Sequence, residues 1–203
     1  MDCFALLDQP RRPWLAPEAL KQKFLVLSAE VHPDRVHEAS DEERRAAQQR
    51  YTQLNSAYNR LREPKERLLH LLELELGSKP PQVQSIPPDL MNRFMEVSGI
   101  CREADGFLAE KAKTVSPLLQ VQLFERNHEF ASKLLGLQKS LNAGQEELMA
   151  ELRALDELWT QEPDAERKRD PNLLQRMQNL YRLFSYYSRW TSQIQERLLQ
   201  LSL

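Results

Sequence analysis

The sequence is poor in glycine and cysteine. Only 5 of its 203 residues are glycine, a share well below the roughly 7% of average usage, which disfavours glycine-rich phosphate loops and tight β-hairpins. The two cysteines, Cys3 and Cys101, form neither a disulfide framework nor a zinc-type pair. We therefore expect a reducing, cytoplasmic setting, no metal site and no cofactor.

An excess of one charge and a long hydrophobic run are also missing. The 28 Lys+Arg residues balance 30 Asp+Glu residues, so nothing indicates binding to nucleic acid. No apolar run reaches the length of about 18 residues that a membrane span needs. The chain starts without the basic stretch of a signal peptide, so we expect none. Hydrophobic residues still make up 41% of the chain, which is enough to build a core.

Hydrophobic spacing predicts helices along most of the chain, and therefore an all-α fold. We expect a short first helix within residues 2–8, then a proline-containing loop, then a helix that starts at Pro17. This second helix has an apolar face made of Leu20, Phe24, Leu27 and Val31. Ser40 and Glu43 have the spacing of a capping box at the start of a third helix.

A proline-rich segment separates two predicted domains. Residues 65–76 form a leucine-rich helix that Gly77 can end, and residues 78–88 contain four prolines. Such a segment is a semi-rigid spacer. We expect a first domain, a joint and a second domain over residues 1–76, 77–87 and 88–203.

The second domain has the three-four spacing of a helix bundle. Apolar residues alternate by four and three from Leu90 to Leu108 and again from Leu173 to Leu201. Between these segments, leucines at helical spacing predict helices over 117–142 and 145–161, with a break at Asn142-Ala-Gly144. The pattern indicates an antiparallel helix bundle.

A stiff turn is predicted between the second and third helices. His32 precedes Pro33 and Asp34, and proline restricts both its own φ and the residue before it. The turn can therefore present an imidazole and a carboxylate at the tip of a helical hairpin. Taken alone, the tripeptide fits an ordinary interhelical turn equally well, and a metal site with His37 is a third reading. No nucleophile accompanies it, so we do not expect an enzyme.

The segments on both sides of this turn carry motifs that resemble those of a J-domain. The opening Asp2-Cys-Phe-x-Leu-Leu7 is similar to a first J-domain helix. The third helix and the turn after it carry Ala47-x3-Tyr51-x2-Leu54-Asn55-x-Ala57-Tyr58-x2-Leu61-x-Glu63-Pro64-x2-Arg67. Two further segments are the run from Leu54 to Leu72, closing with Gly77, and the helix start Pro88-Asp-Leu-Met-Asn-Arg-Phe-Met-Glu96. Both resemble the HscB family, the J-domain co-chaperones of iron–sulfur cluster assembly. The resemblance covers about residues 1–76 for the J-domain, and residues 87–108 and 172–201 for the bundle.

The resemblance implies a co-chaperone that acts on two partner proteins. One is a DnaK/HscA-type ATPase chaperone, whose ATP hydrolysis the turn triggers. The residues that match this docking site are His32, Pro33, Asp34 and Arg35, with Lys21 and Lys23 on the second helix. The other partner is an IscU-like iron–sulfur scaffold protein, held by the first and last helices of the bundle. The matching positions are Leu90, Met91, Phe94, Met95 and Leu183.

The second helix departs from the J-domain pattern in its charge. J-domains commonly carry several basic residues there, whereas this chain offers Lys21 and Lys23 and then Leu25, Val26 and Glu30. Our hypothesis is that the contact with the ATPase is more apolar and less sensitive to salt than usual.

The bundle surface leaves two interpretations open. Met91, Phe94 and Met95 fit a binding face and a bundle core equally well. Met95, Ser98 and Arg102 also stand where the family's binding surface carries acidic residues. Two other functions therefore remain: a J-domain adaptor for an unrelated client, and a structural bundle protein that dimerises through its seams.

Overall fold

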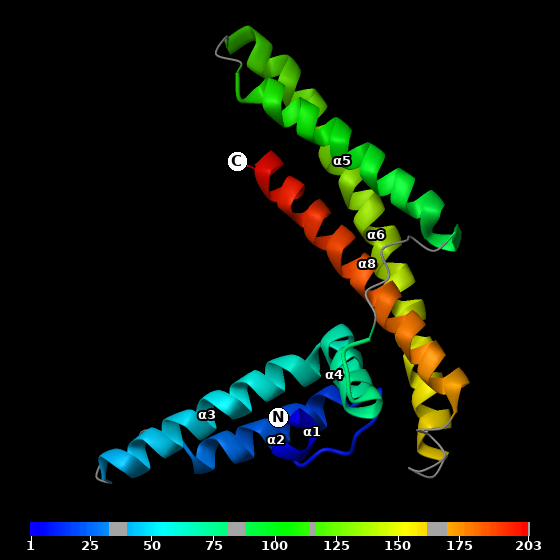
Figure 1. Ribbon diagram of the computed structural model, residues 1–203. Coiled ribbons are helices and arrows are strands. Elements are labelled where there is room, and N and C mark those ends of the chain that lie inside the picture. Colours follow the sequence, from blue (N-terminus) through cyan, green and yellow to red (C-terminus); the bar gives the residue numbers. More distant parts are fainter. Residues whose placement is uncertain (33–39, 81–87, 114–116, 162–169, 203) are drawn as a thin grey trace. The chain divides into compact units, whose positions relative to one another are not determined.

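All described elements of the protein are helical. The computed structural model describes residues 1–32, 40–80, 88–113, 117–161 and 170–202, and no strand occurs within these ranges (Figure 1). The prediction of an all-α fold is therefore confirmed. Along these helices, none combines the length and the apolar character that crossing a bilayer requires.

The contacts of the chain group it into two compact units. The first unit contains Met1–Pro81 and Met149–Arg182, and the second contains Gln82–Leu148 and Leu183–Leu203. This grouping differs from the three ranges expected from the sequence, because residues 149–182 of the predicted second domain belong to the first unit. The division into two domains and a joint stays a prediction.

The first two helices begin as their local sequence dictates. Helix α1 (Cys3–Leu6) starts after Asp2, whose carboxylate accepts hydrogen bonds from the backbone N–H groups of Phe4 and Ala5 at 2.9 and 3.3 Å. Helix α2 (Pro17–Glu30) starts with proline, whose missing N–H has no partner to lose in a first turn.

Helices α3 and α4 have well-formed ends. Helix α3 (Asp41–Arg62) opens with the predicted capping box, in which Ser40 Oγ accepts from Glu43 N at 3.3 Å and Ser40 N donates to Glu43 Oε2 at 2.9 Å. Helix α4 (Pro64–Leu76) ends at Gly77, whose φ of 68° lies in the left-handed region that favours glycine.

Helices α2 and α3 lie side by side and run in opposite directions (Figure 1). The Phe24 ring of α2 stacks on the Tyr58 ring of α3, with 4.4 Å between the centroids. Both helices also pack with α1 and α4 around a small apolar core. Its fully buried members include Phe4, Leu7, Leu20, Leu54, Leu61, Leu68 and Leu72.

Three longer helices follow. A 3₁₀ turn, η2 (Pro88–Leu90), precedes α5 (Met91–Lys111), and then come α6 (Pro117–Gln161) and α8 (Pro171–Ser202). Helix α6 is continuous over 45 residues, so the predicted break at Asn142-Ala-Gly144 is wrong. Helix α8 begins after Asp170, whose carboxylate accepts a hydrogen bond from Asn172 N at 2.7 Å.

Cross-helix contacts set the directions of the helices in the second unit. Near the start of α5, Arg93 donates to Ser140 Oγ of α6 at 2.8 Å, while near its end Glu110 pairs with Arg126 of α6 at 2.8 Å. These two contacts run in opposite order along the two helices. Helices α5 and α6 are therefore antiparallel.

Helix α8 completes the bundle. Its Arg197 pairs with Asp105 of α5 at 2.6 Å, and Asn127 of α6 donates to the carbonyl oxygen of Leu201 at 3.1 Å. The start of α6 thus meets the end of α8, and the predicted antiparallel helix bundle is confirmed (Figure 1).

Gly144 of α6 lies directly against the ring of Tyr187 of α8. A Cβ atom at this position would lie 2.5 Å from the Oη atom and 2.6 Å from a ring carbon of Tyr187. The glycine that the sequence suggested as a break is therefore a packing residue inside a continuous helix.

The loop between α1 and α2, residues 7–16, is held in place by polar side chains from other elements. Arg67 of α4, which is buried, donates to the carbonyl oxygen of Pro13 at 2.6 Å. Trp159 of α6, also buried, donates from Nε1 to the carbonyl oxygen of Arg11 at 3.0 Å. Side chains thereby satisfy backbone carbonyl groups that no helix or sheet engages.

Asp156 of α6 anchors the same loop through its carboxylate. It forms an ion pair with Arg12, whose Nε donates to Oδ1 at 2.9 Å, and it accepts from Trp14 N at 3.1 Å. The side chain of Asp156 is 3% exposed, whereas that of Arg12 is 33% exposed. The hydrogen bond with Asp156 raises the pKa of Arg12.

We predict that Gly144→Ala destabilises the protein by about 1–3 kcal/mol, because the added methyl group must displace the ring of Tyr187. Gly136→Ala in the same helix is the control. No atom lies within 4 Å of its Cβ position, so the higher helix propensity of alanine makes it neutral or stabilising by up to about 1 kcal/mol. Urea denaturation of the two variants measures both effects, and equal losses would contradict the assigned role of Gly144.

We predict that Asp156→Asn costs about 2–3 kcal/mol, because it leaves the Arg12 guanidinium without its counter-charge in a partly buried site. Glu110→Gln is the matched control, since it breaks an ion pair with Arg126 in which both side chains are about half exposed. Such exposed pairs contribute less than about 1 kcal/mol. If the two substitutions shift the urea midpoint equally, Asp156 does not anchor the loop.

Candidate functional site

His32 follows α2 and contacts α3. Its imidazole is half-buried, and its ring meets the Tyr51 ring edge-on with 5.5 Å between the centroids. The packing of α2 against α3 therefore fixes the position of this histidine. The three residues that complete the predicted docking turn, Pro33, Asp34 and Arg35, lie outside the described residues.

The hairpin that carries His32 is the one expected from the sequence. Because α2 and α3 are antiparallel neighbours, the end of α2 and the start of α3 lie at the same end of the pair (Figure 1). The metal alternative depends on Asp34 and His37, which are not described. Within the described ranges, no group of three or more His, Cys, Asp or Glu side chains is arranged to hold a metal ion.

The two predicted basic docking residues on α2 have different surroundings. Lys21 is exposed. Lys23 forms an ion pair with Asp8, with 2.6 Å between Nζ and Oδ2. The hydrogen bond from Lys23 lowers the pKa of Asp8. Lys23 is thus engaged within its own chain, a contact that helical spacing does not reveal.

The five bundle positions differ in exposure. Leu90 is only 7% exposed and belongs to the interior, whereas Met91 and Met95 are exposed on α5. Phe94 and Leu183 are half-buried. The two methionines are therefore accessible to a partner, Phe94 and Leu183 are partly accessible, and Leu90 is not.

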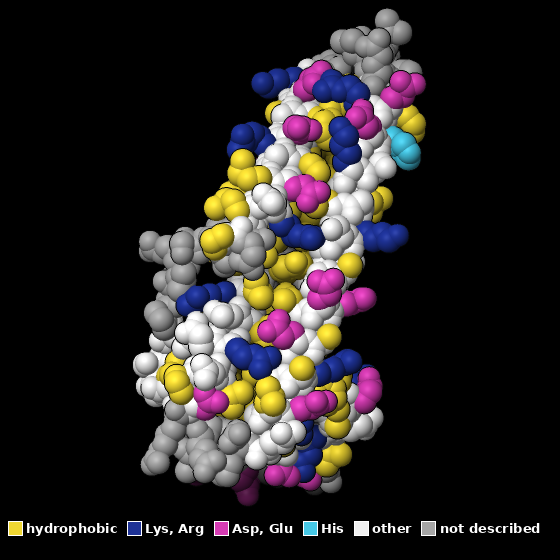
Figure 2. All heavy atoms as spheres, turned by 90° about the vertical axis from the view of Figure 1, so that its right-hand side faces the viewer, with side chains coloured by type: hydrophobic (Ala, Val, Ile, Leu, Met, Phe, Trp, Pro, Cys, Tyr) yellow, Lys and Arg dark blue, Asp and Glu magenta, His cyan; other side chains and the backbone are white. Residues whose placement is uncertain are grey.

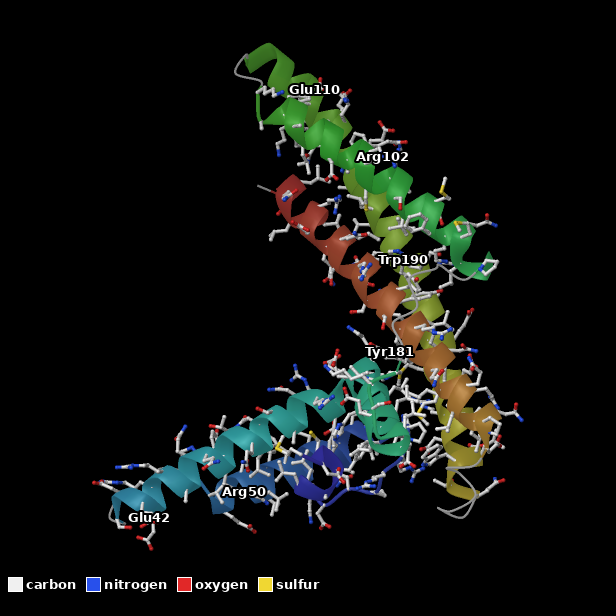
Figure 3. The ribbon with its side chains drawn as sticks, in the orientation of Figure 1. Glu42, Arg50, Arg102, Glu110, Tyr181 and Trp190 are labelled. Carbon is white, nitrogen blue, oxygen red and sulfur yellow. The ribbon has the colours of Figure 1, made fainter. Side chains whose placement is uncertain are left out.

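The start of α5 and the middle of α8 are neighbours in the second unit. The guanidinium of Arg93 lies 6.0 Å from the ring centroid of Tyr187, which is one turn beyond Leu183. Farther along α8, Trp190 is buried, and its ring lies 5.6 Å from that of Tyr187 (Figure 3). Arg93 thus links the first turn of α5 with the aromatic residues of α8.

Sequence reasoning missed the buried polar residues around the first loop. Asp156, Arg67 and Trp159 all lie in stripes of leucines at helical spacing. An acidic side chain next to Leu155 inside such a stripe was the available signal, because a buried carboxylate requires a partner.

His70 and the two cysteines are buried and used in packing. The backbone N–H of Cys3 donates to His70 Nε2 at 2.9 Å, so this nitrogen carries no proton. Burial lowers the pKa of His70 and raises the pKa of the Cys3 and Cys101 thiols. None of the three is presented for chemistry at the surface.

Comparison with known proteins identifies the family. No family model matches the chain. A co-chaperone protein HscB homolog from Burkholderia mallei (strain SAVP1) is 31% identical over 151 residues, covering 73% of this chain and 82% of the relative. The chain belongs to the HscB family of co-chaperones. A further HscB homolog, from Paraburkholderia xenovorans (strain LB400), is 39% identical over 79 residues. That shorter match covers 37% of this chain and 45% of the relative, less than half of its length.

Two solved structures share the fold. The human co-chaperone protein HscB has a TM-score of 0.58 at 20% identity, covering 95% of this chain and 81% of that one. The chaperone HscB from Vibrio cholerae has a TM-score of 0.51 at 21% identity, covering 96% and 99% of the two chains. The resemblance to HscB is thus confirmed for the family and for the all-α fold, and membership agrees with the expectation that the chain is a co-chaperone and not an enzyme.

The surface of this HscB protein mixes both charges. Figure 2 shows Lys and Arg side chains interspersed with Asp and Glu side chains over one face, with hydrophobic side chains between them. Arg102 is exposed on α5, one of the positions where the resemblance led us to note a missing acidic residue (Figure 3).

Proposed function

We propose that this HscB protein is a cytoplasmic co-chaperone that stimulates a DnaK/HscA-type ATPase and delivers an IscU-like iron–sulfur scaffold protein to it. The turn His32-Pro33-Asp34-Arg35 binds the ATPase, and Lys21 and Lys23 lie on the adjoining helix. The observation that carries the proposal is the position of His32 just after α2, at the end of the hairpin where α3 begins, in contact with Tyr51, in a chain of the HscB family.

A small contact is sufficient for this activity. Lowering the barrier to ATP hydrolysis by about 1.4 kcal/mol raises the rate about tenfold. In the proposed contact, Asp34 pairs with an arginine of the ATPase, and charge-assisted hydrogen bonds of this kind are among the strong ones. The turn therefore acts on the partner's nucleotide cycle without catalytic groups of its own.

The scaffold protein binds the start of α5 and the neighbouring part of α8. The exposed side chains of Met91 and Met95 supply the contact area, bordered by Phe94 and Leu183 and supported by Leu90. Methionine is flexible and polarizable, which suits a surface that adapts to its partner. In this proposal the ATPase site belongs to residues 1–76, the scaffold site to residues 88–203, and residues 77–87 join them.

We predict that His32→Gln abolishes stimulation of a DnaK-type ATPase while it leaves the melting temperature nearly unchanged, because the imidazole is only half-buried. Steady-state ATP hydrolysis with and without the co-chaperone measures the effect. His128→Gln, at an exposed position of α6, is the control and should stimulate as the wild type does. Equal stimulation by wild type and His32→Gln would refute the role of the turn.

We predict that Met91→Ala with Met95→Ala weakens scaffold binding about tenfold or more through loss of buried apolar area, while ATPase stimulation without scaffold is retained. Leu199→Ala is the matched control, since Leu199 and Met95 are both 63% exposed. Titration of a fluorescent IscU-like scaffold measures the affinity. If the scaffold fails to bind even the wild type while ATPase stimulation persists, the bundle serves another client.

A further inference from the structure

The outward face of α2 carries an apolar pair close to His32. Leu25 and Val26 are 46% and 56% exposed, and Val26 precedes His32 by six residues. On the inward face of the same helix, Phe24 stacks on Tyr58 of α3. The helix therefore presents large apolar side chains to solvent as well as to its own core.

The fold does not require this pair. At 3.6 residues per turn, Leu25 and Val26 are rotated by about 100° and about 200° from Phe24, away from the contact with α3. Single exposed apolar residues are common on protein surfaces, whereas adjacent ones mark binding sites more often. Ala29, also exposed, extends the apolar surface toward His32 by one turn.

The charged residues of α2 are too balanced to attract a partner protein over a distance. The helix has two acidic residues, Glu18 and Glu30, against Lys21 and Lys23. Of the two lysines, Lys23 is paired with Asp8 at 2.6 Å. Attraction of a partner over a distance requires a net field of one sign, which balanced and internally paired charges do not produce.

The neighbouring part of α3 does not supply such a field either. Glu42 and Arg50 both lie on its N-terminal half, beside the end of α2 that leads to His32 (Figure 3). Asp41, Glu42 and Glu43 are balanced on this half of the helix by Arg44, Arg45 and Arg50, and the field of such balanced charges is screened beyond about 10 Å at ordinary ionic strength. The apolar pair is then the feature of α2 best suited to hold a partner.

We propose that Leu25 and Val26 bind an apolar groove on the partner ATPase chaperone, continuous with the contact made by the His32 turn. This inference rests on the proposed function and specifies how the partner is recognised. Burial of apolar area acts at short range and is insensitive to moderate salt, whereas contacts between exposed charges weaken as salt rises. The ATPase that fits this protein has an apolar surface where α2 docks.

The test is a titration of a DnaK-type ATPase with the full-length protein at low and high salt, about 0.05 and about 0.5 M. For the wild type, the half-saturating concentration changes less than about threefold between the two conditions. Leu25→Gln with Val26→Gln raises that concentration about tenfold, and high concentrations restore stimulation because His32 is intact. Leu135→Gln is the matched control, since Leu135 is 54% exposed on α6.

Each outcome decides the inference. If the glutamine variant melts at a lower temperature than the wild type, the titration is repeated with Leu25→Ala and Val26→Ala together, because alanine favours the helix. A double variant that titrates like the wild type, or a steep rise of the wild-type half-saturating concentration with salt, overturns the apolar contact but leaves the proposed function standing. If neither wild type nor His32→Gln stimulates the ATPase, the proposed function fails and the inference fails with it.

Discussion

The buried carboxylate of Asp156 requires partners, and these constrain the first loop of the first unit. Removing a carboxylate from water costs several kcal/mol, which only well-placed partners offset. Those partners are Arg12 and the backbone N–H of Trp14, both in the loop between α1 and α2. Arg67, whose pKa burial lowers to about 10, ties the same loop to α4. A loop containing two prolines is thereby held by side chains of α4 and α6.

The ends of the helices were predictable because their chemistry is local. The capping box of Ser40 and Glu43 and the left-handed Gly77 depend on residues within one turn of the helix end. Gly144 was misread for the opposite reason. A glycine after Asn142 fits a break, but its purpose is to admit Tyr187, which is far along the chain on α8.

In the candidate site, too, the local features were predictable and those that depend on distant packing were not. His32 belongs to a short motif whose spacing to neighbouring helices carries the information. The exposure of Met91 and Met95 and the burial of Leu90 could not be decided from three-four spacing, because that spacing does not say which flank of the seam the neighbouring helices cover. Asp156 was missed because its partners lie in a loop more than a hundred residues earlier.

The buried thiols have a consequence for a protein proposed to carry iron–sulfur cargo. Only the thiolate form of cysteine ligates iron or reacts readily with oxidants. At neutral pH the thiolate fraction of Cys3 and Cys101 is very small, because burial raises the pKa of both. In the proposed function, neither sulfur is therefore suited to take iron from the cluster of a bound scaffold.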